Sequence, residues 1–215
     1  MRILITAGPT REYIDDVRFL SNASTGRMGC SLARAALAAG HRVILVHGPI
    51  ACEPPRCEKT IPVTSAADML GAVTAHIAEA DAAIMAAAVS DYRPAERIPG
   101  KIKKQHGEQT LRLEATPDIA ATVGRNKAER VHIGFALEAS DGRRNALAKL
   151  RAKNFDLIVL NSPAAIGAEM THAELLFASG ESETLLNVTK DQLAERIVTA
   201  LDMLKGQKGT CDGAR

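Results

Sequence analysis

The sequence predicts an α/β fold, a Rossmann-like three-layer sandwich with a mostly parallel sheet and a C-terminal antiparallel hairpin. Short apolar runs alternate along the chain with amphipathic stretches, as in sheets that helices cover on both faces. A length of 215 residues allows one or two domains, and 46% hydrophobic residues suffice for a sizeable core. We expect a single domain over residues 1–204 and a disordered tail over residues 205–215.

The first part of the chain alternates between strands and helices. Residues 2–7 form an apolar run that ends at Gly8 and Pro9, which predicts a buried strand and a turn, and a polar loop follows over residues 10–25. The next expected elements are a helix at 30–39 that Gly40 ends, a strand at 42–46, a helix at 65–80 and a strand at 82–89. Strands joined by helices in this way pair in parallel.

The second part combines a polar segment with further strands and helices and a hairpin. Residues 91–107 are polar, and residues 110–113 alternate like an exposed strand. We expect helices at 117–124, 143–153 and 190–204, strands at 131–136 and 156–160, and a hairpin that pairs 174–178 with 184–188. In a sheet of this kind, ligands bind at the carboxyl ends of the strands.

Composition excludes several classes of partner. The formal net charge is only +2, and aromatic residues make up 3% without any Trp, which disfavours base-stacking nucleic-acid readers. The N-terminal apolar run is too short for a signal peptide, and residues 82–90 reach only half a membrane span. Four cysteines without metal spacing indicate reduced thiols. We therefore expect a cytoplasmic protein with small-molecule substrates and with neither nucleic acid nor membrane as a partner.

The start of the 30–39 helix is the first candidate site. Ser24, Thr25, Gly26 and Arg27 precede this helix, and Gly8 ends the first strand beside it. Hydroxyls and a glycine at a helix start favour an anion site, with a plain helix cap as the alternative. The pattern is neither a Walker loop nor a dinucleotide fingerprint, and the next strand lacks an acid for a ribose diol. Because both features are absent, the sequence argues against a nicotinamide-dependent dehydrogenase.

Further candidates follow later strands. The small residues at 86–88 precede Asp91, whose carboxylate could hold a metal ion or a ligand hydroxyl, or could only form a turn. The three lysines at 101–104 are either solvent-exposed or contact a polyphosphate. Because no acidic residue nearby in the sequence can pair with them, we expect the 91–104 loop to be mobile and to become ordered when an anion binds. Lys149 and Lys153 share a helix face, which is either solvated or part of the same anion site.

Together these segments resemble the phosphopantothenoylcysteine synthetase family, also called phosphopantothenate–cysteine ligase, in its CTP-dependent bacterial form. The resemblance rests on TAGPTRE at 6–12, STGRMG at 24–29, AAAVSDYRP at 86–94 and KIKK at 101–104, with shorter matches at 15–22, 117–119, 134–136, Lys149 and Lys153. It implies a ligase that joins 4′-phosphopantothenate to L-cysteine in coenzyme A biosynthesis. CTP would give an acyl-cytidylate and pyrophosphate, and cysteine would then displace CMP. The family needs Mg²⁺ and forms homodimers.

The resemblance also implies roles for individual residues. Asn22 and Lys101 match catalytic positions, Asp91 is the candidate metal ligand, and the start of the 30–39 helix with Gly8 would bind phosphate or substrate. The positions that match nucleotide contacts are Ala87, Asp91, Lys101, Pro117, Asp118, Ile119, Ala120, Phe135, Lys149 and Lys153.

The sequence departs from the family pattern in minor ways. Thr25 and Arg27 replace a serine and a lysine, Thr116 replaces an asparagine, and Ala139 replaces a threonine. Because the chain starts at its own first strand, we expect no fused flavin domain and no FMN, and a separate flavin-dependent decarboxylase is a candidate partner. The alternatives are a nicotinamide- or flavin-dependent Rossmann oxidoreductase and a non-catalytic nucleotide-binding module.

Overall fold

A computed structural model describes residues 1–104, 106–165 and 168–211. One 8-stranded sheet has the order β12-β11-β10-β9-β6-β1-β4-β5. Its parallel strands are β1 (Arg2–Ala7), β4 (Arg42–His47), β5 (Lys59–Pro62), β6 (Ala82–Met85), β9 (Val131–Leu137) and β10 (Leu157–Asn161). The antiparallel strands β11 (Met170–Phe177) and β12 (Ser182–Thr189) extend one edge. The predicted α/β class and the hairpin are confirmed, whereas β5 was not predicted.

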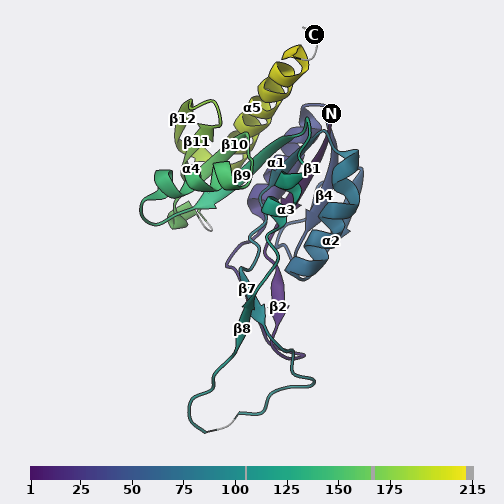
Figure 1. The fold of residues 1–215 in the computed structure, drawn as a ribbon, viewed down its shortest axis with the longest axis vertical. Helices are drawn as coiled ribbons and strands as arrows, with labels where there is room; N and C mark the ends of the chain where they lie inside the picture. Colours follow the sequence, from purple (N-terminus) through teal and green to yellow (C-terminus); the bar gives the residue numbers. More distant parts are fainter. Residues whose placement is uncertain (105, 166–167, 212–215) are drawn as a thin grey trace.

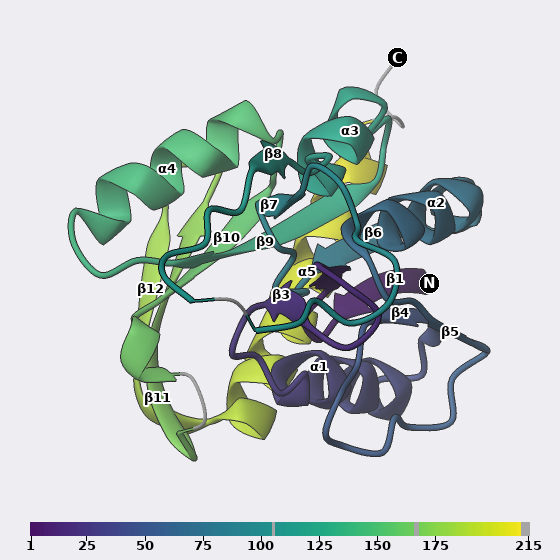
Figure 2. The ribbon, with the colours of Figure 1, turned by 90° about the horizontal axis from the view of Figure 1, so that it is seen from below.

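Helices cover both faces of this sheet, as Figure 2 shows. Along β1, Ile3 and Ile5 join one core with α1 (Arg27–Ala38) and α5 (Lys190–Cys211). Leu4 points to the other core, which contains α2 (Ala66–His76), α3 (Ile119–Arg125) and α4 (Gly142–Ala152). Short 3₁₀ turns follow α2 at Ile77–Glu79 and β10 at Pro163–Ala165. No helix in the described part of the chain has the length and apolar character that crossing a membrane requires.

The last helix is longer than the sequence predicts. α5 continues past Leu204 to Cys211, so the first part of the expected disordered tail is helical. Lys208 explains why the helix continues, because its Nζ lies 3.0 Å from Asp156 Oδ1 and donates to the Arg130 carbonyl oxygen at 2.9 Å. The rest of the expected tail, residues 212–215, lies outside the described residues.

Two small antiparallel pairs form an arm that extends from the carboxyl edge of the sheet (Figure 1). They are β2 (Arg11–Tyr13) with β3 (Phe19–Ser21), and β7 (Tyr92–Pro94) with β8 (Leu113–Ala115). We call residues 11–21 and 92–115 the arm. The sequence predicted a loop where β2 and β3 lie, and it placed the exposed strand at 110–113 rather than at β8.

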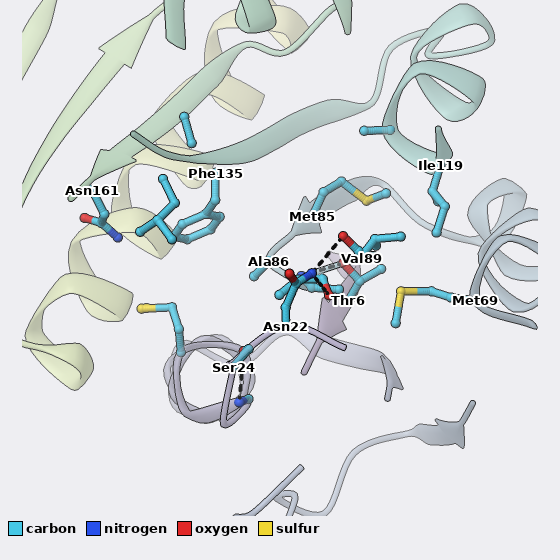
Figure 3. Close-up of a pocket in the computed structure, with 18 of the residues that line it drawn as sticks. Thr6, Asn22, Ser24, Met69, Met85, Ala86, Val89, Ile119, Phe135 and Asn161 are labelled. Carbon is cyan, nitrogen blue, oxygen red and sulfur yellow. Dashed lines mark hydrogen bonds between the residues drawn. The ribbon is translucent and has the colours of Figure 1, made fainter. Parts of the chain in front are cut away.

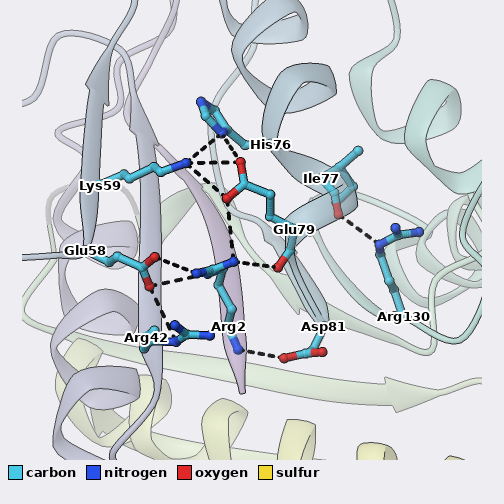
Figure 4. A network of polar contacts seen from close by, with 9 residues as sticks. All are labelled: Arg2, Arg42, Glu58, Lys59, His76, Ile77, Glu79, Asp81 and Arg130. Carbon is cyan, nitrogen blue, oxygen red and sulfur yellow. Dashed lines mark hydrogen bonds and ion pairs between the residues drawn. The ribbon is translucent and has the colours of Figure 1, made fainter.

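A polar network holds the opposite edge of the sheet (Figure 4). The Arg2 guanidinium lies 2.7 Å from Glu58, and Glu79 accepts hydrogen bonds from Lys59 at 3.0 Å and from His76 at 2.9 Å. His76, and then Lys59, lower the pKa of the Glu79 carboxyl to about 2. The network ties β1 and β5 to the end of α2. It lies at the amino ends of the parallel strands and leaves the carboxyl ends for a binding site.

A buried histidine should make stability depend on pH. His132 lies on β9 with no exposed surface, and neither ring nitrogen has a partner among the described residues. Burial, followed by the charge of Lys127, lowers the pKa of His132 from 6.5 to about 4. Between these pH values the unfolded chain binds more protons than the folded one. The free energy of unfolding should therefore fall by about 3 kcal/mol as the pH is lowered through this window.

Urea unfolding at a series of pH values checks this expectation. His132→Leu removes the titrating group and keeps a side chain of similar size at this buried position, so the variant should lose less stability between neutral pH and pH 4 than the wild type. Equal losses in the two proteins would show that other groups carry the acid sensitivity.

Candidate active site

A cavity of about 740 Å³ opens at the carboxyl edge of the sheet, between the ends of β1, β6, β9 and β10 and the start of α1 (Figure 3). Most of the residues singled out in the sequence line it: Asn22, Ser24, Thr25, Gly26, Arg27, Ala87, Asp91, Pro117, Asp118, Ile119, Ala120, Phe135, Lys149 and Lys153. Gly8 and Lys101 are not among the described residues that line it. The fold thus gathers segments that are far apart in sequence into a space of the size usual for small-molecule ligands.

The start of α1 is shaped by two glycines and one isoleucine. Gly8 and Gly26 have φ values of 74° and 77°, in the left-handed region that favours glycine. A Cβ at Gly26 would lie 2.2 Å from Ile50 Cγ2, and one at Gly8 would lie 2.6 Å from the same atom. Gly8 therefore lies against Ile50, and it is not among the described residues that line the cavity. The backbone N–H groups of the first turn of α1 remain at the cavity, in an arrangement suited to an anion.

Asn22 is held by two backbone carbonyl groups. Its Nδ2 donates to the carbonyl oxygens of Ala88 and Val89, each at 3.0 Å. β6 ends at Met85, earlier than the predicted strand at 82–89, although Ala88 still pairs with Pro9. The Ala88 carbonyl oxygen also accepts the Thr10 N–H at 3.3 Å. With both amide hydrogens directed to the protein, Oδ1 is the atom of Asn22 that can accept a hydrogen bond from a ligand.

Lys149 on α4 and Lys153, the residue that follows α4, do not lie on a solvated face, which was one of the two alternatives that their spacing left open. Lys149 is half-buried and donates to the Phe135 carbonyl oxygen at 2.7 Å, while Lys153 lies 3.0 Å from Asp118 Oδ2. Burial, followed by the neighbouring charge of Lys153, lowers the pKa of Lys149. Asp118 also caps α3 by accepting the Ala121 N–H at 2.9 Å. The pair is positioned at the cavity by β9 and α3.

Lys101 lies instead on the connection between β7 and β8, where its neighbours Gly100 and Ile102 contact the turn between β2 and β3. Asp15 has no exposed surface and accepts the Ile102 N–H at 3.0 Å and the Arg18 Nε–H at 3.0 Å. Asp16 accepts the Gly100 N–H at 2.8 Å on the other side of Lys101. Carboxylates therefore anchor the backbone on both sides of Lys101. The expected ordering of the 91–104 loop by a bound anion stays a prediction.

The hydrogen bonds also govern the charge of Asp15. Burial would raise the pKa of this carboxyl, but N–H groups of Arg18, Val17 and Ile102 outweigh it and lower the pKa to about 2. Asp15 consequently stays ionised over the ordinary pH range.

The cavity also includes residues that the sequence patterns did not single out. Asn161 ends β10, and its Oδ1 is buried without a hydrogen-bond partner in the described part of the chain. Lys190, at the start of α5, lines the cavity and donates to the Ala168 carbonyl oxygen at 2.6 Å. The position of Asn161 could have been predicted, because the carboxyl ends of the parallel strands meet at the binding site and Asn161 is the last residue of β10. No local signal marks Lys190, because tertiary packing alone brings α5 here.

Comparison with known proteins agrees with this arrangement. The family described as DNA/pantothenate metabolism flavoprotein C-terminal domain matches residues 1–204. The coenzyme A biosynthesis bifunctional protein CoaBC of Bacillus subtilis is 42% identical over 212 residues, which are 96% of this chain and 52% of that protein. The Escherichia coli CoaBC is 42% identical over 165 residues, 75% of this chain and 41% of that protein. The chain thus spans about half the length of the curated relatives it matches.

Two solved structures share the fold. A crystal structure of the C-terminal domain of a CoaBC protein has a TM-score of 0.83 at 39% identity and covers 96% of both chains. A Cab2 variant in complex with phosphopantothenate-cysteine has a TM-score of 0.82 at 17% identity, covering 99% of this chain and 89% of that chain. At that identity the second likeness concerns the fold alone.

Proposed function

Because the chain belongs to the DNA/pantothenate metabolism flavoprotein C-terminal domain family, we propose that it is a phosphopantothenate–cysteine ligase that uses CTP. The observation that carries the proposal is the cavity, where the start of α1 faces Lys149 and Lys153 from across the sheet edge. One side offers N–H groups for a phosphate, and the other offers ammonium groups. The names of the relatives, which refer to coenzyme A biosynthesis, support the same substrate class.

The residues suit activation of a carboxylate. Attack by the carboxylate of phosphopantothenate on the α-phosphorus of CTP expels pyrophosphate, and the two lysines reduce the repulsion between these anions. The cysteine amine then attacks the acyl carbon and CMP leaves. Asn22 Oδ1 can accept a hydrogen bond from that amine and orient it. The chemistry requires no nucleophile from the protein.

Magnesium fits this site as an ion carried by the nucleotide. Mg²⁺ is commonly held by one or two carboxylates together with substrate phosphates. Asp91 lines the cavity and supplies one carboxylate, and no group of three or more metal-binding side chains occurs in the described ranges. When bound, the ion would neutralise phosphate charge, and Asp91 would hold it beside the nucleotide.

One assay distinguishes this function from its alternatives. The protein is incubated with CTP, Mg²⁺, phosphopantothenate and cysteine, and pyrophosphate and the amide product are followed. Ligase activity gives both in equal amounts. A nucleotide-binding module would bind CTP without releasing pyrophosphate, and an oxidoreductase would require a nicotinamide or flavin instead.

Lys149→Gln should raise the KM for CTP by about tenfold to a hundredfold. A hydrogen bond to a charged group typically contributes about 1.5–3 kcal/mol, and glutamine cannot supply the charge. Steady-state kinetics measure the effect. Arg151→Gln removes an exposed cation from the same helix, outside the cavity lining, and is the matched control. Equal KM values for the two variants would remove Lys149 from the nucleotide site.

The position of Lys101 leads us to propose a homodimer in which the arm reaches the cavity of a second copy. The arm exposes large apolar side chains, as expected for a surface that another chain covers: Val17, Phe19, Tyr92, Ile98, Leu111 and Leu113. Lys101, whose two neighbours Gly100 and Ile102 donate to Asp16 and Asp15, would then contribute to the partner's cavity.

A mixing experiment tests this arrangement. Asn22→Asp and Lys101→Gln each inactivate the site, and each does so by changing a different residue. If the two residues of one site come from different copies, mixed dimers contain one intact site, and unfolding and refolding the two variants together should restore activity. If the arm folds over its own cavity, the mixture stays as inactive as its components. Light scattering measures the oligomeric state independently.

A further inference from the structure

Two cysteines meet beside the start of α1. Cys30 lies within the first turns of α1 and has no exposed surface, whereas Cys52 lies on the connection between β4 and β5 and is partly exposed. Their Sγ atoms are 2.7 Å apart. A disulfide bond is about 2.05 Å long, so only a small movement separates the two thiols from a covalent link.

The backbone around this pair is held in place by contacts that do not involve sulfur. The N–H of Ala51, next to Cys52, donates to the Thr25 carbonyl oxygen at 3.1 Å. Ile50 fills the space over Gly26 that a side chain there would need. Both thiols therefore belong to segments that are already docked together. Thr25 and Gly26 also line the cavity, so a link at this place would lie directly behind the expected anion site.

We propose that Cys30 and Cys52 are a reversible dithiol–disulfide pair that a peroxide oxidises. In the first step the Cys52 sulfur attacks one peroxide oxygen, the O–O bond breaks, and a sulfenic acid and water form. In the second step the Cys30 sulfur attacks the Cys52 sulfur and gives up its proton, the S–O bond breaks, and the departing hydroxide takes that proton and leaves as a second water. Each thiol loses one hydrogen, and the peroxide is reduced to two waters. A dithiol reductant reverses the reaction by exchange.

The environments of the two sulfurs set the order of these steps. Burial, followed by the hydrogen bond with Cys52, raises the pKa of the Cys30 thiol to about 12, so Cys30 is protonated and shielded from the oxidant. Cys52 is the partly exposed sulfur that the peroxide can reach. Cys57 lies on the same connection and is also partly exposed, but it has no comparable sulfur contact in the described structure. It provides a matched control within the same protein.

Peroxide treatment of the full chain tests the proposal. The reduced protein is exposed to hydrogen peroxide, the remaining thiols are alkylated, and peptides are mapped by mass spectrometry without reduction. We expect a cross-linked pair of peptides that contain Cys30 and Cys52, an alkylated Cys57, and full reversal by dithiothreitol. The variant Cys57→Ser should form the same link, and Cys52→Ser should retain a reduced Cys30.

Two outcomes would overturn the proposal. One is a wild-type protein in which peroxide yields sulfinic acid at Cys52 without a link. The other is a link from Cys52 to Cys57, or between two chains, in place of the link to Cys30. Because the readout is covalent mass and not turnover, the result does not depend on the proposed ligase activity.

Discussion

Asn22→Asp should reduce the rate of amide formation by about 10²–10³ while leaving the fold intact, which is the effect of losing one well-placed polar group in an active site. The structure gives the reason in two parts. The amide hydrogens point at the carbonyl oxygens of Ala88 and Val89. An aspartate would place a charged oxygen against these two acceptors, so the side chain turns away. Its charge also repels the phosphate of the acyl-nucleotide.

The measurement for Asn22→Asp is the rate of cysteine-dependent product formation, with pyrophosphate release followed in parallel. Pyrophosphate release should fall less, because the first step relies on the lysines. Asn126→Asp makes the same charge change at an exposed position outside the cavity lining and should keep wild-type rates. Near-normal turnover by Asn22→Asp would refute the assigned role and leave Asn22 as a residue of the turn.

Gly26→Ala should strongly destabilise the protein. A non-glycine residue in the left-handed region costs about 1–2 kcal/mol. Overpacking adds about 1–3 kcal/mol, because the new Cβ would lie 2.2 Å from Ile50 Cγ2 and 2.9 Å from Ile50 Cβ. The Cβ atom of Ile50 cannot rotate away, so the 48–52 backbone must move. Protein that still folds should bind CTP poorly, because the first turn of α1 shifts with it.

Gly40→Ala separates the two contributions. Gly40 has a φ of 80°, close to that of Gly26, but a Cβ there meets nothing within 4 Å. Gly40→Ala should lower the free energy of unfolding only by the cost of the left-handed backbone conformation, and its enzyme kinetics should stay normal. Urea unfolding of the two variants gives the difference. If Gly40→Ala and Gly26→Ala lowered the free energy of unfolding equally, the contact with Ile50 would contribute nothing to the destabilisation.

Long periodic elements were predictable from the sequence, whereas the arm was not. β1 and α1 have clear apolar patterns and strong end signals, and both were placed close to their observed bounds. β2, β3, β7 and β8 contain three residues each, which is too short for any periodicity to register. Pairing with distant segments defines them, and a single sequence does not display such pairing.

The candidate site divides in the same way. The order of the strands, together with the resemblance to the ligase family, predicted that Asn22 and the start of α1 lie at the carboxyl edge of the sheet. The contacts of individual side chains do not. The i, i+4 spacing of Lys149 and Lys153 indicated a common face but could not show that Phe135 and Asp118 from other elements would hold them. The hydrogen bond from the Ile102 N–H, next to Lys101, to Asp15 likewise spans many intervening residues.

The strand order of the sheet has a consequence for synthesis on the ribosome. Among the strands of the main sheet, β1 is made before the others and is a central strand. Each later strand pairs with one that has already been made: β4 with β1, β5 with β4, β6 with β1, and then β9, β10, β11 and β12 in turn. No strand has to be inserted between two earlier ones. The sheet can therefore grow outward as the chain lengthens. α1 is the exception, because its apolar face is covered by α5, which is made later than every strand of the sheet.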